Sequence, residues 1–229
     1  MRATPLLRSE LEALFPEAFK THQPRRHDTI STGISEVDLA TGGIPVSTLS
    51  EICGSGKTSV LTSLLAHASH EHYCALVDGK DSFDPASADA AGANLSRLLW
   101  VRCGKSKQKL PPLEQAFAIA DILLHSGGFG LVAVDLGDFS DRLLNKIEPA
   151  IWFRFARAVE KQRTALVFIE EQHHARSCAG LVLNLKTKHS PLSSTLIMKL
   201  EFEAELIRTA DKKLPSSVRP IFALRTEWA

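Results

Sequence analysis

The sequence predicts an α/β fold, with a doubly wound, mostly parallel sheet, helices on both faces and an antiparallel C-terminal hairpin extension. Two observations lead to this prediction. From Thr29 onward, short apolar segments alternate with helical ones, which is typical of βαβ units. Several apolar segments are continuous rather than alternating, as expected of parallel strands that are covered on both faces.

The residues before this alternation are expected to form an arm. Residues 9–20 (SELEALFPEAFK) carry apolar side chains at helical spacing, and a polar segment with a proline follows them. We therefore divide the chain into an N-terminal helix and linker, residues 1–28, and a core, residues 29–229. A helix this short is marginal in water, so it is expected to dock on the core or on a neighbouring molecule.

The core is expected to alternate strands with helices. The predicted parallel strands are 48–53, 73–78, 98–102, 131–135 and 164–170. The predicted helices are 57–70, 85–92, 113–126 and 149–162. The tail changes character, because segments 181–186, 195–207 and 218–228 have strand patterns. We expect antiparallel hairpins at the sheet edge there and no separate C-terminal domain.

Composition is that of an ordinary globular protein, with 44% hydrophobic and 23% charged residues. A net charge of +1 argues against a globally basic nucleic-acid coat. The four cysteines form no C-x-x-C pair, so buried reduced thiols are favoured over disulfides or a zinc site. We recognise no signal peptide and no membrane-spanning stretch, so a cytoplasmic location without membrane contact is expected.

Four segments of the core resemble the bacterial RecA recombinases. Residues 30–45 (ISTGISEVDLATGGIP) precede a strand and a Gly-Lys-Thr helix start, and 74–85 (CALVDGKDSFDP) follow. LVAVD (131–135) is similar to a Walker B strand, and TALVFIEEQ (164–172) to the strand that carries the family's nucleotide-sensing glutamine. The segments arrive in the family's order across residues 29–171. The resemblance implies a RecA-like core with shortened DNA-binding loops.

Two further segments are similar to one branch of this superfamily, the ImuA proteins. They are GANLSRLLWVRC (92–103) and HSGGFGLVAVDL (125–136). The resemblance implies a RecA- and SulA-related accessory factor of the bacterial mutasome, which serves damage-induced (SOS) translesion synthesis with a Y-family-like partner and a specialised replicative polymerase. The expected partner is thus a mutasome or RecA-type protein.

The Gly-Lys-Thr segment raises the question of whether a nucleotide binds. A phosphate-binding loop has the pattern G-x-x-x-x-G-K-[ST], but Glu51 occupies the position of its first glycine. The residues left to hold phosphates are Gly54, Ser55, Gly56, Lys57 and Thr58. Relative to RecA, we count three fewer residues between strand and helix, roughly 10 Å of contour at about 3.3 Å per residue. We expect a vestigial loop that holds an anion weakly at the helix N-terminus.

The resemblance also implies a catalytic glutamate two residues after Asp78. Lys80 stands there, and an ammonium group cannot accept a proton from the attacking water. Asp81 is adjacent, but successive residues point in different directions, so it could substitute only with a rearranged backbone. We expect Lys80 to be a solvated surface lysine.

The nucleotide sensor and the metal site are altered or incomplete. Glu170 and Glu171 occupy the family's Asn-Gln positions, and Gln172 comes one residue late, on the opposite face of a strand. The two carboxylates would either repel a γ-phosphate or form a solvated strand end. Asp135 fits a Walker B aspartate, so Thr58 and Asp135 are the candidate Mg²⁺ residues if ATP binds.

Segment 172–199 contains no Asp or Glu and is a candidate single-stranded DNA contact through Arg176, Lys186 and Lys188. It lacks interleaved aromatic residues for base stacking. The alternative is a polar loop and an edge strand whose lysines discourage aggregation. The His173-His174 pair has no second ligand group at metal-site spacing, so loop histidines are favoured over a metal site.

The helix 149–162 is a candidate partner surface. Trp152, Phe153 and Phe155 cannot all face one stripe of a helix, so at least one is expected to be exposed. The N-terminal helix is the other candidate, because the equivalent arm of RecA packs on the next protomer.

The sequence thus predicts a catalytically degenerate RecA-like protein of bacterial DNA repair that acts through protein contacts and needs no cofactor. The alternative is an ATP-dependent RecA-type recombinase or paralog that binds ATP, Mg²⁺ and single-stranded DNA. A third hypothesis is a nucleic-acid-binding module that uses the acid-free segment alone.

Overall fold

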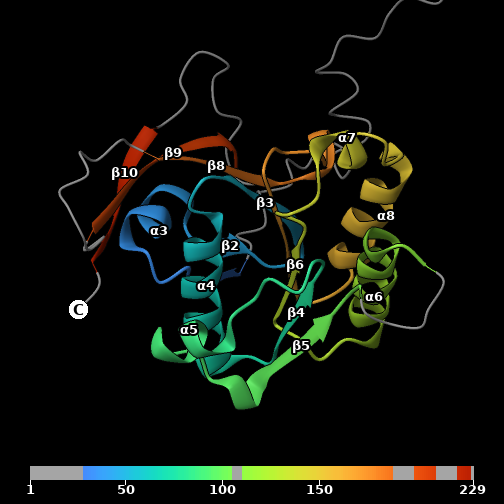
Figure 1. Cartoon of the computed structure of the whole chain (residues 1–229), viewed down its shortest axis with the longest axis horizontal. Helices are drawn as coiled ribbons and strands as arrows, with labels where there is room; N and C mark the ends of the chain where they lie inside the picture. The colour runs from blue at the N-terminus through green and yellow to red at the C-terminus, as the bar shows by residue number, and fades with distance from the viewer. Residues whose placement is uncertain (1–27, 105–109, 188–198, 210–220, 228–229) are drawn as a thin grey trace, which may run out of the picture.

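The computed structural model describes residues 28–104, 110–187, 199–209 and 221–227, so the N-terminal helix lies outside the described residues (Figure 1). The described strands form an eight-stranded sheet in the order β10-β9-β8-β3-β7-β6-β4-β5, and a separate ribbon of β1 and β2. Neighbours from β8 to β5 are parallel, whereas β9 and β10 are antiparallel. The predicted α/β fold with its antiparallel C-terminal hairpin is confirmed.

The elements follow the predicted alternation. The strands are β1 (Thr29–Ile30), β2 (Ile44–Pro45), β3 (Thr48–Gly54), β4 (Cys74–Asp78), β5 (Leu98–Arg102), β6 (Leu131–Asp135), β7 (Ala165–Glu170), β8 (Leu181–Thr187), β9 (Lys199–Arg208) and β10 (Ile221–Glu227). The helices are α3 (Ser35–Thr41), α4 (Lys57–Glu71), α5 (Pro85–Ala90), α6 (Pro112–Ser126), α7 (Asp141–Leu144) and α8 (Pro149–Glu160), with 3-10 turns η1 (Leu95–Arg97) and η2 (Arg176–Cys178). Each parallel strand and each helix predicted for residues 48–170 is present. Helices α3 and α7 were not predicted.

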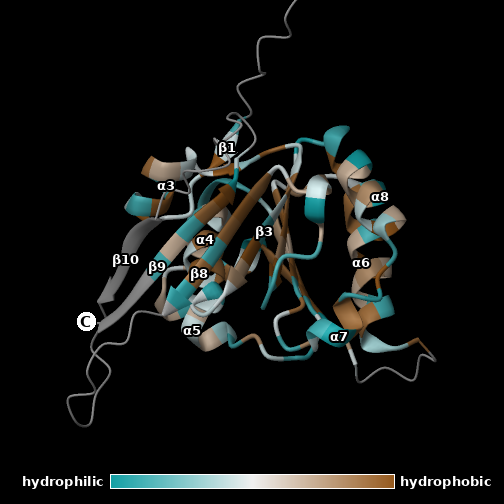
Figure 2. Ribbon diagram, turned by 90° about the horizontal axis from the view of Figure 1, so that it is seen from above, coloured by the Kyte–Doolittle hydropathy of each residue, from teal (hydrophilic) through white to brown (hydrophobic). Residues whose placement is uncertain are grey.

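Two hydrophobic clusters cover the two faces of the sheet. Helix α4 packs on one face, and α6 and α8 lie side by side on the other (Figures 1 and 2). Strand β7 supplies both clusters, because Val167 and Ile169 face α4 while Leu166 and Phe168 face α6 and α8. This alternation explains why its sequence is continuously apolar, as predicted for a strand covered on both faces.

Strand β8 lies inside the sheet, between β3 and β9. The alternative that made it an edge strand with protective lysines is therefore wrong for β8. The edges are β5 and β10. Three cysteines are buried and Cys178 is half-buried, all as free thiols, in agreement with the prediction. No described helix is long and apolar enough to cross a lipid bilayer.

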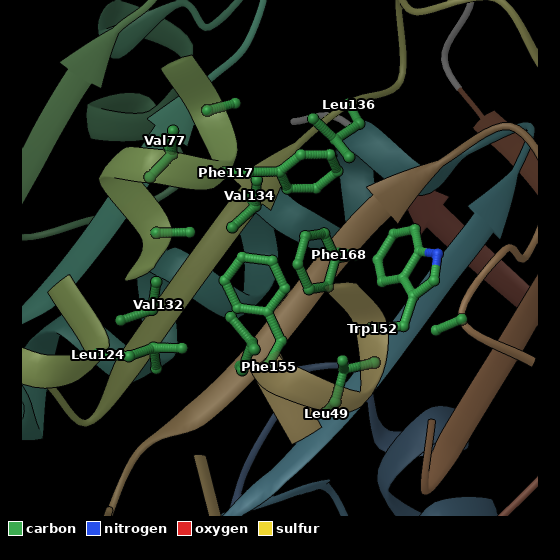
Figure 3. Packing of buried hydrophobic residues seen from close by; sticks show 14 of the residues in the cluster. Leu49, Val77, Phe117, Leu124, Val132, Val134, Leu136, Trp152, Phe155 and Phe168 are labelled. Atoms are coloured by element: carbon green, nitrogen blue, oxygen red, sulfur yellow. The ribbon is translucent and has the colours of Figure 1, made fainter. Parts of the chain in front are cut away.

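Aromatic side chains fill the space between β7, α6 and α8 (Figure 3). Phe168 packs edge-to-face against Trp152 and Phe155, with ring centroids 5.0 and 5.6 Å away, and Phe117 closes the group. Trp152 and Phe155 are buried, whereas Phe153 is 50% exposed. The prediction that one aromatic residue of this helix reaches solvent is confirmed.

Candidate functional site

The shortened phosphate-binding loop lies between β3 and α4. Strand β3 continues to Gly54, and α4 begins at Lys57, so only Ser55 and Gly56 connect them. Gly54 and Gly56 both have left-handed backbones, with φ of 84° and 94°. A side chain at Gly54 would meet the Leu185 carbonyl oxygen at 2.1 Å, so β8 packs directly against this turn. Gly54, the first residue left of the loop, is therefore part of the pairing between β3 and β8.

Lys57 and Asp135 are brought together at the carboxyl end of the sheet. The Lys57 side chain runs over Gly137, where an added Cβ would lie 2.4 Å from its Cε and 3.2 Å from Asp135 Oδ1. The Lys57 ammonium forms an ion pair with Glu171. Thr58 is exposed on the first turn of α4, and its carbonyl accepts from Thr62 Oγ1 at 2.9 Å. The cation that would meet a phosphate is thus paired with a carboxylate of the chain itself.

Asp78, which ends β4 two residues before Lys80, is a structural residue. Its side chain is buried and accepts hydrogen bonds from the Ser82 and Phe83 backbone N–H groups, each at 3.0 Å, and from Trp100 Nε1 at 3.1 Å. These bonds hold the loop after β4 in place. Because both carboxylate oxygens already accept hydrogen bonds, Asp78 has few lone pairs left to bind a metal ion or a water molecule.

The position of the missing catalytic base is occupied by a cation, as the sequence shows. Lys80 is exposed and lies over the Phe139 ring, 4.8 Å from its centroid. Asp81 has a left-handed backbone, with φ of 61°, and Arg102 donates hydrogen bonds to both of its carboxylate oxygens. The rearranged backbone is therefore present at Asp81, but it directs the carboxylate to an arginine.

Glu170 is fully buried, so the hypothesis of a solvated strand end is wrong for this residue. Its carboxylate hydrogen-bonds to His174 Nδ1. Glu51, also fully buried, accepts from the His174 and Ala175 backbone N–H groups at 2.6 and 2.7 Å. Glu51 and Glu170 follow Leu49 and Phe168 at two-residue spacing, which places them on the α6–α8 face of the sheet, opposite α4.

Burial dominates the electrostatics of this cluster. Desolvation raises the pKa of Glu170 to about 7, and the negative charge of Glu51 raises it further. Burial also raises the pKa of Glu51. Burial lowers the pKa of His174, but the hydrogen bond and charge of Glu170 outweigh it and raise the pKa overall. The pair therefore retains a proton at neutral pH. Desolvation also raises the pKa of Asp135 to about 6.

The sequence did not predict the role of Glu51, which was noted only as the residue at the position of the first glycine of a phosphate-binding loop. The available signal was a charged residue inside the apolar strand TLSEIC, because a buried carboxylate requires hydrogen-bond donors. Those donors come from the loop after β7, more than a hundred residues away, and local patterns do not predict such a contact.

The structure describes two of the three predicted DNA-contact residues, Arg176 and Lys186. Arg176 is exposed in the turn after β7 and has a left-handed backbone, with φ of 50°. Lys186 lies on β8, with its ammonium 3.6 Å from Glu205 Oε2. Lys188 lies outside the described residues.

Comparison with known proteins places this geometry in context. The RecA N-terminal domain family matches residues 18–139, a little over half of the chain. Protein RecA of Ectopseudomonas oleovorans is 39% identical over 114 residues, 47% of this chain and 31% of that protein. Protein RecA of Colwellia psychrerythraea is 29% identical over 164 residues, 63% of this chain and 46% of that protein. In these matches the chain spans less than half of the relatives' length.

Proposed function

The chain belongs to the RecA N-terminal domain family, and on this premise we propose that it is a catalytically degenerate RecA-like protein. It serves bacterial DNA-damage tolerance as a translesion-synthesis accessory in the cytoplasm, and it acts through contacts with a mutasome or RecA-type protein. Its ATP turnover is at background level.

The ion pair between Lys57 and Glu171 supports this proposal most directly. Phosphoryl transfer depends on positioning and on electrostatic stabilisation of the phosphates, for which the loop lysine is central. Here a nucleotide must first displace a carboxylate that belongs to the chain. Two further acids near the site are also held by the chain itself. Asp78 accepts hydrogen bonds from the loop after β4, and Asp81 accepts hydrogen bonds from Arg102.

The alternative, an ATP-dependent recombinase or paralog, also has an observation in its favour. Asp135 ends β6 beside Lys57, as a metal-side aspartate would, and the Gly-Lys-Thr helix start is retained. Thr58 and Asp135 would hold a magnesium ion, which would supply positive charge to the phosphates of ATP, and the recombinase would also bind single-stranded DNA.

Phosphate release from Mg²⁺-ATP, with and without single-stranded DNA, separates the two functions. We expect the wild-type chain and the Lys57→Ala variant to give the same background rate. Glu171→Gln is the matched variant, because it frees the lysine without supplying a base. We expect it to bind a fluorescent ATP analogue more tightly and still to release no phosphate.

A DNA-stimulated rate that disappears in Lys57→Ala would contradict the proposal and establish the alternative. Turnover in Glu171→Gln would also contradict it, because the residues for catalysis would then be present and only blocked.

A further inference from the structure

A groove of about 500 Å³ lies between the C-terminal halves of α6 and α8. The two helices lie side by side on the face of the sheet opposite α4 (Figures 1 and 2). Half-buried Ala158 packs against the hydrophobic cluster of that face and forms the floor of the groove. The other lining residues are polar or charged, and they are Asp121, His125, Arg154, Arg157, Lys161 and Gln162.

Positive charge predominates in this lining. Arg154, Arg157 and Lys161 carry full positive charges, and Asp121 is the single carboxylate among the lining residues of the described chain. Arg154 and Lys161 are seven residues apart, which is about 10 Å along a helix axis, and Arg157 lies between them. At this spacing the three cations form one stripe along α8 and the residue that follows it.

The acids close to the groove do not cancel this charge. Asp121 is shared, because its Oδ1 lies 3.5 Å from Arg154 Nε and its Oδ2 lies 3.9 Å from His125 Nδ1. Exposed Glu160 lies about 160° around α8 from the floor of the groove, so it belongs to the far side of the helix. Glu114 lies seven residues before Asp121, about 10 Å away along α6.

Two of the three cations have no carboxylate partner. Within the part of the chain that the structure describes, neither Arg157 nor Lys161 forms an ion pair. Cations in the last turn of a helix also offset its dipole, but this effect is confined to that turn and does not account for Arg154, two turns from the end. Unpaired cations that line a concave surface favour an anionic ligand.

We propose that this groove binds an acidic segment of a partner protein, whose carboxylates pair with Arg157 and Lys161. The inference rests on the proposed function, since a protein that acts through contacts needs a contact site. An arginine fork binds a carboxylate with two parallel hydrogen bonds, so Arg157 would also orient the segment.

A nucleic acid is the less fitting ligand. Its backbone carries a negative charge at every nucleotide and would have to pass Asp121, whereas a peptide can place a neutral or basic residue there. The lining residues of the groove also include no aromatic side chain on which a base could stack.

Selection of phage-displayed random peptides on the full chain, without nucleotide, tests the proposal. Counter-selection on the double variant Arg157→Ala/Lys161→Ala removes peptides that bind elsewhere. We expect the remaining peptides to be rich in Asp and Glu. Binding of a labelled selected peptide should weaken roughly tenfold or more in each single variant. It should also weaken as ionic strength rises from about 0.1 to about 1 M, because salt screens exposed charges.

Arg163→Ala is the matched control. It also removes one positive charge, but Arg163 lies outside the groove lining and pairs with Asp28 at 3.1 Å. We expect it to leave peptide binding within about twofold of the wild-type value. Far-UV circular dichroism of every variant establishes that the fold is retained.

The proposal is overturned if counter-selection leaves no peptide or if the remaining peptides are not rich in acids. It is also overturned if Arg157→Ala and Lys161→Ala weaken binding no more than the control does, because these cations would then serve the helix alone. Binding of labelled oligodeoxythymidine that is lost in the double variant, with no acidic peptide selected, would assign the groove to nucleic acid instead. Because these measurements use no ATP, their failure is distinct from a finding of ATP turnover.

Discussion

Glu51 connects the loss of the phosphate-binding loop to the fixed turn after β7. A phosphate-binding loop has glycine at this position, and a carboxylate there must find donors once it is buried. It finds them in the His174 and Ala175 backbone N–H groups. Truncation of Glu51 would leave both groups without a partner, at about 1–3 kcal/mol for each. The residue that departs from the family pattern is therefore needed by the fold.

The buried carboxyl groups predict how stability depends on pH. The folded state raises the pKa of Glu170 from 4.5 to about 7, so it holds a proton that the unfolded chain has released. The contribution of Glu170 to the free energy of unfolding is therefore expected to be fully present below pH 4.5 and to be lost as pH rises to about 7, a change of about 3 kcal/mol. Glu51, Asp135 and His174 shift in the same direction and add to this slope. Urea unfolding across this pH range measures it.

Glu170→Gln serves as the matched variant, because the amide keeps the shape of the side chain and does not titrate. Its free energy of unfolding should vary less between pH 5 and 7 than that of the wild-type chain. Equal slopes in the two proteins, or a wild-type stability that rises over this range, would show that Glu170 is not the group responsible.

Helix α8 has a buried side and an exposed side, and its aromatic residues distinguish them. Phe155 is fully buried against Phe168 and Phe117 (Figure 3). Phe153, two positions earlier, is half exposed. We expect Phe155→Ala to lower the free energy of unfolding by about 3–5 kcal/mol, because it leaves a cavity. Phe153→Ala should change it by about 0.5 kcal/mol or less.

Urea unfolding of the two variants gives both values by the same method. A large loss in Phe153→Ala would contradict the assignment of this ring to the exposed side of the helix. A small loss in Phe155→Ala would contradict the packing between β7 and α8.

The elements were largely predictable because their signals are local. The continuous apolar segments of β4 and β6, and Pro149 at the start of α8, define those elements within a few neighbouring residues. Short α7 was missed because a single turn of helix has no periodicity to detect. The partners of Glu170 and Glu171 were missed for another reason. Glu170 contacts His174 because both side chains are buried, and local sequence does not show that burial. Glu171 pairs with Lys57, which is more than a hundred residues away in the chain.

At the scale of the whole molecule, one sheet separates two hydrophobic clusters that share its strands. Val167 and Ile169 of β7 belong to one cluster, and Leu166 and Phe168 belong to the other. Opening either face exposes strand residues that the other face holds in place. The described core is therefore expected to unfold as one cooperative unit.

Trp100 and Trp152 allow this prediction to be tested, because they pack against opposite clusters. One variant retains Trp152 alone, and the other retains Trp100 alone, with the remaining tryptophans changed to phenylalanine. We expect the fluorescence midpoint of each variant in urea to coincide with the midpoint of its own far-UV circular dichroism. Loss of the Trp100 hydrogen bond to Asp78 should lower both midpoints of the first variant together, since it costs about 1 kcal/mol. A Trp100 signal that changes at lower urea than the circular dichroism would mean that the α4 face opens first and that the two clusters are not coupled.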